Sequence, residues 1–265
     1  MLIKFALSQV IGGREIQEDT CALVADGVIV VPDDNGGASG SASNDLFAVM
    51  CDGMGGHAGG EVASQIAAGV MIEVIQQRAY ASHNLSQQLK QACLAANNAI
   101  AMEVHGQSEL EGMGTTIVAL RIQNGILNWV SVGDSHLLLL SKREVIKLNQ
   151  DHSMKPVIER MVDKGIITRD DARNHPDRNA LRSVLSGDEF ELIDTGAGGW
   201  PVRSGDVFIL ASDGLDVVPL REINKAFGKW RKPDLLSVAR KLVMNACEVG
   251  GLHQDNTSII IIKVA

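Results

Sequence analysis

Apolar residues follow two different spacings along the chain, and each spacing predicts its own kind of element. In three segments they recur at every third or fourth position, which is typical of helices with one apolar face. These segments contain Val62, Ile66, Val70 and Val74; Leu85, Leu89, Cys93, Ala96 and Ile100; and Leu235, Val238, Leu242 and Ala246. A second row, from Ala63 to Ile75, runs beside the first stripe. The first two helices are expected to face a sheet.

Short apolar runs bounded by turn residues predict strands. They cover residues 2–10, 20–31, 46–51, 115–122, 126–132, 136–141, 144–148, 182–185, 190–195, 207–211 and 258–264. The links 124–125, 133–135 and 142–143 are too short for a parallel crossover, so they predict antiparallel neighbours. The small polar segment 32–44 lacks apolar periodicity and predicts a flexible loop.

The arrangement of these elements favours an α+β fold in one domain over residues 1–265. Strands in meanders, broken by helices, predict two antiparallel sheets covered by helices rather than a doubly wound parallel sheet. Residues 153–180 are polar and partly helical, which indicates an excursion from the sheet. No internal repeat and no linker divides the chain.

Composition and charge narrow the function classes. The chain has 265 residues, 45% of them apolar, which is enough for one large core. A net charge of −8 disfavours binding to the phosphate backbone of nucleic acids. The longest apolar runs, 137–140 and 259–262, are far too short to span a bilayer, and the N-terminus is predicted to be a first strand. The protein is therefore expected in the cytoplasm, without a membrane or nucleic-acid partner.

The four cysteines are expected to be buried free thiols in a reducing compartment, because none forms a C-x-x-C pair and each lies in an apolar pattern. They are Cys21, Cys51, Cys93 and Cys247.

Four acids lie at the ends of predicted strands. Asp52, Asp134 and Asp213 each follow an apolar strand beside a glycine, and Asp255 precedes the last strand. Any one of them alone is better explained as a turn residue or helix cap. Together they favour a shared metal centre, because clustered carboxylates need cations or protons to balance them. Oxygen ligands without zinc-type His/Cys spacing indicate Mg²⁺ or Mn²⁺.

The stretch VMCDGMGGHAGGEVA, residues 49–63, places five glycines within eight residues after Asp52. Glycines are expected where a ligand approaches the backbone closely, so the Gly53 carbonyl is a candidate metal ligand. His57 has two interpretations, a proton donor to a leaving group or a structural loop histidine.

Residues 14–19 add a cation and two further acids. The planar guanidinium of Arg14 can grip two phosphate oxygens. Glu18 and Asp19 can hold water bound to a metal. Without the four acids, a surface turn of mixed charge would be the simpler interpretation.

The ordered motifs resemble the metal-dependent type 2C protein serine/threonine phosphatases in their bacterial form. From about residue 12 to 262 they are GGREIQED, VMCDGMGGHAGGEVAS, GMGTT, WVSVGDSH, LNQDHS, ITRDDARNHPDRNALRSVLSG, SGDVFILASDGL and HQDNTSIIII. The resemblance implies a four-layer α-β-β-α sandwich, two antiparallel sheets flanked by helix pairs. It also implies a mobile segment beside the active site over about residues 153–188, which we call the flap.

The resemblance also assigns roles to the residues already singled out. It implies two Mg²⁺ or Mn²⁺ ions bridged by Asp52, with the Gly53 carbonyl, Asp213 and Asp255 as further ligands. Arg14 would bind phosphate, and Glu18 and Asp19 would hold water. A third, weaker ion would involve Asp134 together with Asp213.

Four departures from the family pattern bear on these roles. His136 follows the GDS motif where the family usually has arginine, which predicts the loss of a local salt bridge. Asp216 is one position out of step with the family's next acid and is not assigned to metal. Segment 32–44 resembles an insertion, and aligning His57 with the family's proposed general acid requires a gap.

The expected activity is hydrolysis of phosphoserine and phosphothreonine in proteins by water activated at the two metals. The substrates would be phosphorylated proteins made by a serine/threonine kinase, and the enzyme would be a monomer. The alternatives are a catalytically weak, phosphoprotein-binding regulator of the same fold, a cation-binding protein without activity, and a two-metal phosphodiesterase.

Overall fold

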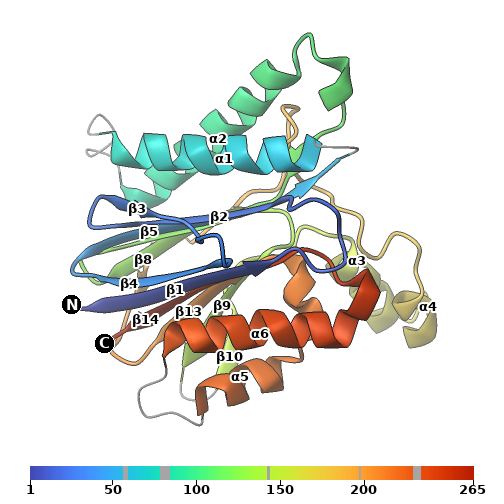
Figure 1. Cartoon of the computed structure of the whole chain (residues 1–265). Coiled ribbons are helices and arrows are strands. Elements are labelled where there is room, and N and C mark those ends of the chain that lie inside the picture. The colour runs from blue at the N-terminus through green and yellow to red at the C-terminus, as the bar shows by residue number, and fades with distance from the viewer. Residues whose placement is uncertain (56–58, 78–83, 142–143, 197, 229–233) are drawn as a thin grey trace.

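Two antiparallel sheets pack face to face, and a pair of helices covers the outer face of each (Figure 1). The structure is a computed structural model that describes residues 1–55, 59–77, 84–141, 144–196, 198–228 and 234–265. The predicted fold class is therefore confirmed.

The first sheet contains both ends of the chain. In spatial order its strands are β10 (Glu144–Lys147), β9 (His136–Ser141), β13 (Val207–Ala211), β14 (Thr257–Val264), β1 (Ile3–Val10) and β4 (Gly37–Ala42). Helices α5 (Leu220–Gly228) and α6 (Leu235–Gly250) lie on its outer face. The first and last strands pair along their whole length, from Ile3 opposite Val264 to Val10 opposite Thr257.

The second sheet carries the other helix pair. Its main path is β11 (Asp194–Thr195), β8 (Ile126–Val132), β7 (Ile117–Gln123), β5 (Asp45–Met54), β2 (Asp19–Ala25) and β3 (Val28–Val30). Two short strands, β12 (Trp200–Pro201) and β6 (Gly114–Thr115), pair with β8 and β5. Helices α1 (Gly59–Gln76) and α2 (Leu85–Val104) cover this sheet (Figure 1).

Shorter helices complete the described chain. The flap holds α3 (Lys155–Asp163) and α4 (Arg169–Arg173), which lie beyond one end of the sheets (Figure 1). The 3₁₀ turns are η2 (Ser108–Leu110), η3 (Asp213–Val217) and η4 (Gly251–His253).

The core forms three apolar layers, as a sandwich of this kind requires. The central layer lies between the sheets and includes Leu23, Leu46 and Phe208. The two outer layers lie under the helix pairs. In α1 the row from Ala63 to Ile75 is buried, whereas Val62, Ile66 and Val70 of the neighbouring row are partly buried and only its last member, Val74, is buried.

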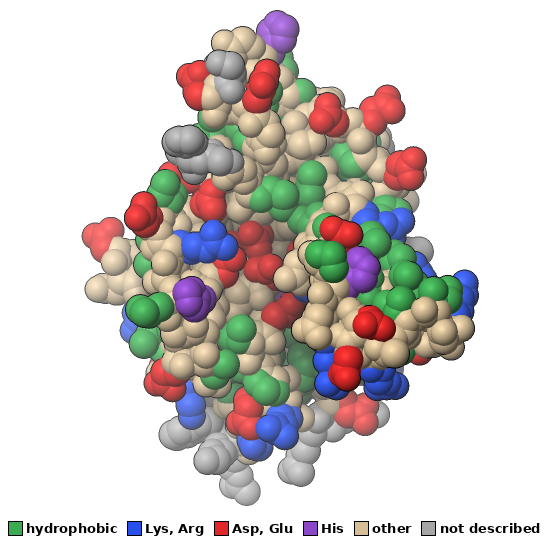
Figure 2. Space-filling view, turned by 90° about the vertical axis from the view of Figure 1, so that its right-hand side faces the viewer, with side chains coloured by type: hydrophobic (Ala, Val, Ile, Leu, Met, Phe, Trp, Pro, Cys, Tyr) green, Lys and Arg blue, Asp and Glu red, His purple; other side chains and the backbone are tan. Residues whose placement is uncertain are grey.

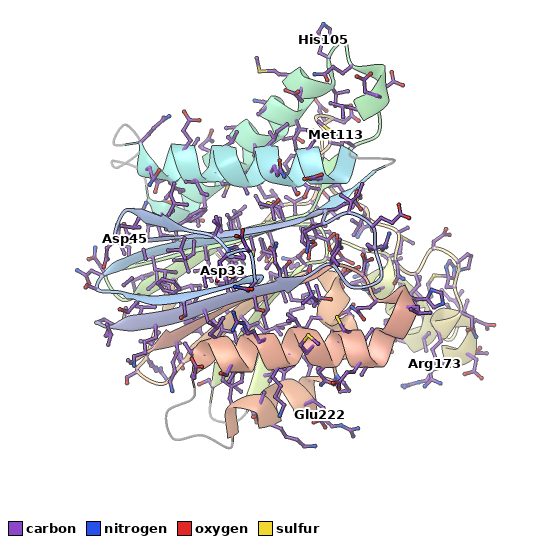
Figure 3. The ribbon with its side chains drawn as sticks, in the orientation of Figure 1. Asp33, Asp45, His105, Met113, Arg173 and Glu222 are labelled. Carbon is purple, nitrogen blue, oxygen red and sulfur yellow. The ribbon has the colours of Figure 1, made fainter. Side chains whose placement is uncertain are left out.

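Two expectations for the N-terminal third are wrong. Residues 20–31 form a hairpin of β2 and β3, because Asp26 and Gly27 take positive φ values of 47° and 88° at the turn. Segment 32–44 is not simply a loop, since it contains β4, which pairs with β1. Its start is fixed by Asp33, labelled in Figure 3, whose carboxylate accepts hydrogen bonds from the backbone N–H groups of Asn35 and Gly37.

The sequence of β4 concealed the strand because an edge strand can be held by its backbone alone. Glycine and serine give no apolar periodicity to read. A side chain at Gly40 would meet the ring of Phe5 at 2.7 Å, so this glycine lets the aromatic ring cover the strand.

The link 133–135 does not join antiparallel neighbours. It carries the chain from β8 in one sheet to β9 in the other, and so crosses the sandwich at its end. The predicted strand 182–185 is reduced to isolated bridges at Leu181 and Leu185, and 190–195 is reduced to β11. The amphipathic helix α5 was not predicted.

Candidate metal centre

The acids identified in the sequence come together at one end of the sandwich. They lie where β5 and β13 end, where β14 begins, and where the chain crosses between the sheets. Figure 2 looks onto this end and shows acidic side chains gathered near the centre of the face. Arg14 forms an ion pair within this group.

Asp52 is held by backbone contacts on both sides. It lies opposite Asp19 in the β5–β2 register, and its N–H donates to Oγ1 of Thr116 at 3.2 Å. Its carboxylate accepts a long contact, 3.5 Å, from the N–H of Asp213. Burial raises the pKa of Asp52 well above its ordinary value, and the charges of Asp19 and Asp213 add to this. The Asp52 carboxylate is therefore short of compensating positive charge.

Asp213 is the first residue of η3, directly after β13. Burial raises the pKa of its carboxyl to about 6, and the neighbouring charges of Asp134 and Asp255 contribute. This repulsion places the four predicted acids within electrostatic reach of one another.

Asp19 lies deeper and has a protein partner. Its side chain accepts a hydrogen bond of 2.7 Å from the hydroxyl of Ser212, which in turn accepts one of 3.0 Å from the N–H of Ser258. Burial raises the pKa of Asp19 to about 7, although the hydroxyl of Ser212 opposes the shift. Asp19 thus ties the start of β2 to the residue before Asp213.

Glu18 holds an oxygen that needs a partner. In the described part of the chain, Oε1 of Glu18 is buried without a hydrogen-bond partner. Burial raises the pKa of this carboxyl, and the nearby charge of Arg14 offsets part of the shift. A buried acceptor without a donor is costly, so this atom fits an ordered water or a cation.

Arg14 and Asp255 form an ion pair at the rim of the acid group. Nη2 of Arg14 donates to Oδ2 of Asp255 at 2.6 Å, and the side chains are 53% and 42% exposed. The hydrogen bond to Asp255 and its charge raise the pKa of the guanidinium further. Arg14 therefore lies beside the acids while remaining open to solvent.

Asn256 fixes the turn that carries Arg14. Its side-chain oxygen accepts the N–H of Glu18 at 2.7 Å. Its amide nitrogen donates to the carbonyls of Ile11 and Ile16 at 2.8 and 3.1 Å. One buried side chain thus holds the 11–18 turn against the start of β14.

The acidic oxygens fit hard divalent cations, but the side chains alone do not form a complete set of ligands for one ion. Carboxylates with raised pKa values and an orphaned acceptor oxygen form a site that is short of positive charge. Among the described residues, however, no group of three or more His, Cys, Asp or Glu side chains is arranged to hold one ion. Ions here would need backbone carbonyl oxygens and water beside the carboxylates, which Mg²⁺ accepts readily.

The glycines after Asp52 serve close packing of the backbone. A Cβ at Gly53 would lie 2.1 Å from the carbonyl oxygen of Gly60 and 2.7 Å from that of Glu18. A Cβ at Gly60 would meet Oε1 of Glu18. These glycines therefore let the start of α1 approach the acid-bearing turn. His57 lies outside the described residues.

Asp134 is buried and lies beside Lys155. The two side chains are 3.4 Å apart, and burial raises the pKa of Asp134 while the Lys155 charge lowers it. The backbone around Asp134 is held by the hydroxyl pair Thr116–Ser135 at 2.7 Å.

The loss of a salt bridge expected at His136 is offset, because His136 keeps a hydrogen bond to Asp216 and Lys155 forms an ion pair with the same carboxylate. Nε2 of His136 lies 2.7 Å from Oδ1 of Asp216, and Nζ of Lys155 lies 2.9 Å from Oδ2 of the same carboxylate. Nδ1 of His136 is 2.9 Å from Nζ of Lys147, a donor only, so the ring hydrogen belongs on Nε2. Burial opposes ionisation of Asp216, but His136 and Lys155 hold its pKa well below the usual range.

Sequence reasoning missed four residues of this region: Lys147, Lys155, Ser212 and Asn256. Each acts through a partner distant in the sequence. The only local signal was that Ser212 and Asn256 each adjoin a predicted metal ligand.

Three of the four thiols are buried, as predicted. Cys21, Cys51 and Cys93 are buried and free, whereas Cys247 is partly exposed. Burial raises the pKa of Cys93 to about 12, so this thiol does not ionise near neutral pH. In the described part of the chain, no helix has the length and apolarity needed to cross a membrane.

Comparisons with known proteins agree with this geometry. A family model described as protein phosphatase 2C matches residues 29–245. The serine/threonine protein phosphatase PstP of Mycobacterium tuberculosis is 34% identical over 216 residues, which cover 81% of this chain and 40% of PstP. The serine/threonine phosphatase stp of Listeria monocytogenes is 29% identical over 234 residues, which cover 87% of this chain and 89% of that protein.

A solved structure extends the match to the whole fold. The crystal structure of the catalytic domain of PstP in complex with two manganese ions has a TM-score of 0.76 and 28% identity, and the match covers 100% of both chains. In the sequence comparison with full-length PstP, by contrast, the match spans only about 40% of that protein.

Proposed function

The chain belongs to the protein phosphatase 2C family, and we propose that it is a metal-dependent phosphatase that removes phosphate from phosphoserine and phosphothreonine in other proteins. One observation at the end of the sandwich supports this proposal most strongly. The carboxylates of Asp52 and Asp213 have too little positive charge around them to stay ionised easily, and the solvent-exposed guanidinium of Arg14 lies beside this acid group.

Asp52, Asp213, Asp255 and the backbone carbonyl of Gly53 are the proposed ligands of two Mg²⁺ or Mn²⁺ ions. The raised pKa values of Asp52 and Asp213 support this assignment, because bound cations would hold both groups ionised. The bound ions would lower the pKa of water and neutralise phosphoryl oxygens. The two manganese ions in the PstP catalytic domain agree with the proposed number.

The side chains around this centre have separate roles in the proposal. Arg14 binds and orients the phosphoryl group with its planar fork. Glu18 offers its unpartnered Oε1 to the attacking water and can accept a proton there, because its pKa is raised. Asp19 fixes Ser212 and, through it, the position of Asp213, and a role in holding water is proposed for it as well.

The proton donor, the oligomeric state and the substrates are also part of the proposal. The proton for the leaving oxygen comes from water or from His57. The chain is proposed to act as a monomer, with residues 1–265 as one catalytic domain. Phosphorylated proteins are the proposed substrates, and a serine/threonine kinase is the class of enzyme that would make them.

The test is hydrolysis of p-nitrophenyl phosphate and a phosphothreonine peptide with Mn²⁺, with and without EDTA. EDTA should abolish turnover and added Mn²⁺ should restore it. Turnover of bis-p-nitrophenyl phosphate instead would indicate a phosphodiesterase. Binding of the phosphopeptide without turnover would favour the regulator.

Asp52→Asn supplies the matched variant for this assay. It keeps the size of the side chain but removes the charge that the ions require. Activity should fall more than about 100-fold, because even residues that only orient metal ligands typically account for 10–100-fold. Circular dichroism checks the fold, and a folded Asp52→Asn variant with nearly full activity at saturating Mn²⁺ would refute the two-metal scheme.

A further inference from the structure

Lys155 reaches from the flap to two acids at the edge of the metal centre. Its Nζ lies 2.9 Å from Oδ2 of Asp216 and 3.4 Å from Oδ2 of Asp134. Lys155 begins α3, whereas Asp134 lies in the link between β8 and β9 and Asp216 lies in η3. One ammonium group therefore joins three parts of the chain that are distant in sequence.

This contact is more than a solvent-exposed ion pair. The Asp134 side chain is 5% exposed and that of Lys155 is 17% exposed. A carboxylate buried to this extent needs a cation close to it, and removing that cation leaves an uncompensated charge. The cluster also adjoins the metal centre, because Asp216 lies in η3, the 3₁₀ turn that begins at Asp213.

A second lysine supports the same cluster from the sheet. Nζ of Lys147 donates to the backbone carbonyl of Asp134 at 3.2 Å and lies 2.9 Å from Nδ1 of His136. His136 in turn contacts the other oxygen of Asp216. His136 thus holds Oδ1 of Asp216 in place, and Lys155 binds the other oxygen of the same carboxylate.

The flap has few other contacts that would hold it in place. Only Ile158 is buried in α3 and only Ala172 in α4. Figure 3 labels Arg173 on α4, which lies beyond the end of the sheets. The ends of the flap are tied by backbone hydrogen bonds of Met154 to Ala180 and of Leu185 to Thr115. Lys155 is the side chain of α3 that ties this helix to the acids.

The sequence-based expectation gave Asp134 to a third metal ion, and the structure gives its carboxylate oxygen to Lys155. A divalent ion and an ammonium group would compete for the same oxygen. We propose that Lys155 is a positioning residue whose ammonium takes the place of an additional divalent ion at Asp134 and latches the flap to the metal end of the sandwich. The proposal rests on the proposed function for the role of the neighbouring centre.

The first test counts bound ions, using equilibrium dialysis of the full chain against Mn²⁺. Lys155→Met keeps the length of the side chain and removes the charge, Lys155→Arg keeps the charge, and Lys164→Met is the control at the exposed end of α3. Lys155→Met should bind one more Mn²⁺ than the native chain, or bind it at least about tenfold tighter. Lys155→Arg and Lys164→Met should match the native chain. An unchanged ion count and affinity in Lys155→Met would overturn the cation-substitute role.

The second test measures hydrogen–deuterium exchange of peptides from residues 155–180. Lys155→Met should exchange faster there, with no change in β5 or β13, whereas Lys155→Arg and Lys164→Met should not. Equal exchange in native chain and Lys155→Met would overturn the latch. Neither readout depends on turnover, so loss of the proposed phosphatase activity would leave this inference standing, and failure here would leave the activity standing.

Discussion

At the rim of the acid group, the guanidinium of Arg14 lies 2.6 Å from Asp255 and is half exposed. This pair explains how one residue can serve two partners. In the proposed function, an ion bound to Asp255 would weaken the hold of this carboxylate on the guanidinium, and Arg14 would then turn to a phosphoryl group. Asn256, buried beneath the turn, keeps the backbone of this segment in place while the side chain moves.

Replacing Arg14 with alanine should raise KM for p-nitrophenyl phosphate roughly 10–100-fold with little change in kcat, since a charge-assisted hydrogen bond contributes about 1.5–3 kcal/mol. Steady-state kinetics with Mn²⁺ measures both constants. Arg221→Ala, on the exposed face of α5, is the control. A fall in kcat at constant KM would show that Arg14 acts in the transition state alone.

The acids could be found from sequence because each stands at a strand end, where a buried charge is unusual. Their partners could not. Asp134 has its ammonium 21 positions away in Lys155, and Asp19 has its hydroxyl 193 positions away in Ser212. Spacing along a chain carries no signal for such pairs. For the same reason, the sequence at His136 predicts a lost salt bridge but does not reveal that Lys155 forms an ion pair with Asp216.

At the scale of the element, the turn between β5 and α1 brings two backbone segments into contact that side chains would separate. Gly53 and Gly60 lie so close that a Cβ on either one would strike the other segment or Glu18. The packing of α1 against this turn therefore determines where Glu18 and Asp52 lie.

Gly53→Ala should lower the free energy of unfolding by about 1–3 kcal/mol, because the added Cβ would lie 2.1 Å from the carbonyl oxygen of Gly60 and the backbone must shift. Mn²⁺ affinity should fall with it. Urea unfolding and calorimetric titration give the two values. Gly69→Ala is the matched control in α1, where a Cβ meets open space, and it should stabilise by about 0.5–1 kcal/mol. Equal stability of Gly53→Ala and the native chain would contradict the close approach.

Strands and helices with clear periodicity were predicted well. Residues 126–132, 136–141 and 207–211 have the bounds expected from their apolar runs. The strand β4 was missed because its backbone pairs at a sheet edge without an apolar face. The crossing at 133–135 was missed because a three-residue link fits either a hairpin or a change of sheet, and the sequence does not say which face the next strand joins.

For the whole molecule, the acid group links ion binding to stability. Burial raises the pKa of Asp213 to about 6 and that of Asp19 to about 7, against about 3.9 in an unfolded chain. Between these values the folded state binds more protons than the unfolded state. Their contribution to stability is therefore complete below pH 4 and is lost as pH rises through 6 to 7.

Metal-free protein should thus be more stable at pH 5 than at pH 8, by on the order of 4 kcal/mol from these two groups, since each pKa unit corresponds to about 1.4 kcal/mol. Saturating Mn²⁺ should remove the difference, because cations stabilise the ionised carboxylates. Urea unfolding at both pH values, with EDTA or Mn²⁺, measures this. Asp213→Asn should show a smaller pH slope without metal. A native chain more stable at pH 8 in EDTA would contradict the assignment.

In the proposed function, Asp52 joins two divalent ions at the end of the sandwich where Asp213 and Asp255 also lie. Diffraction at the manganese absorption edge, from crystals grown with Mn²⁺, tests it most directly. Two anomalous peaks are expected, each within about 2.6 Å of a carboxylate oxygen of Asp52, with Asp213 and Asp255 among their other neighbours. Peaks elsewhere on the molecule, with the Asp52 carboxylate facing water alone, would contradict it.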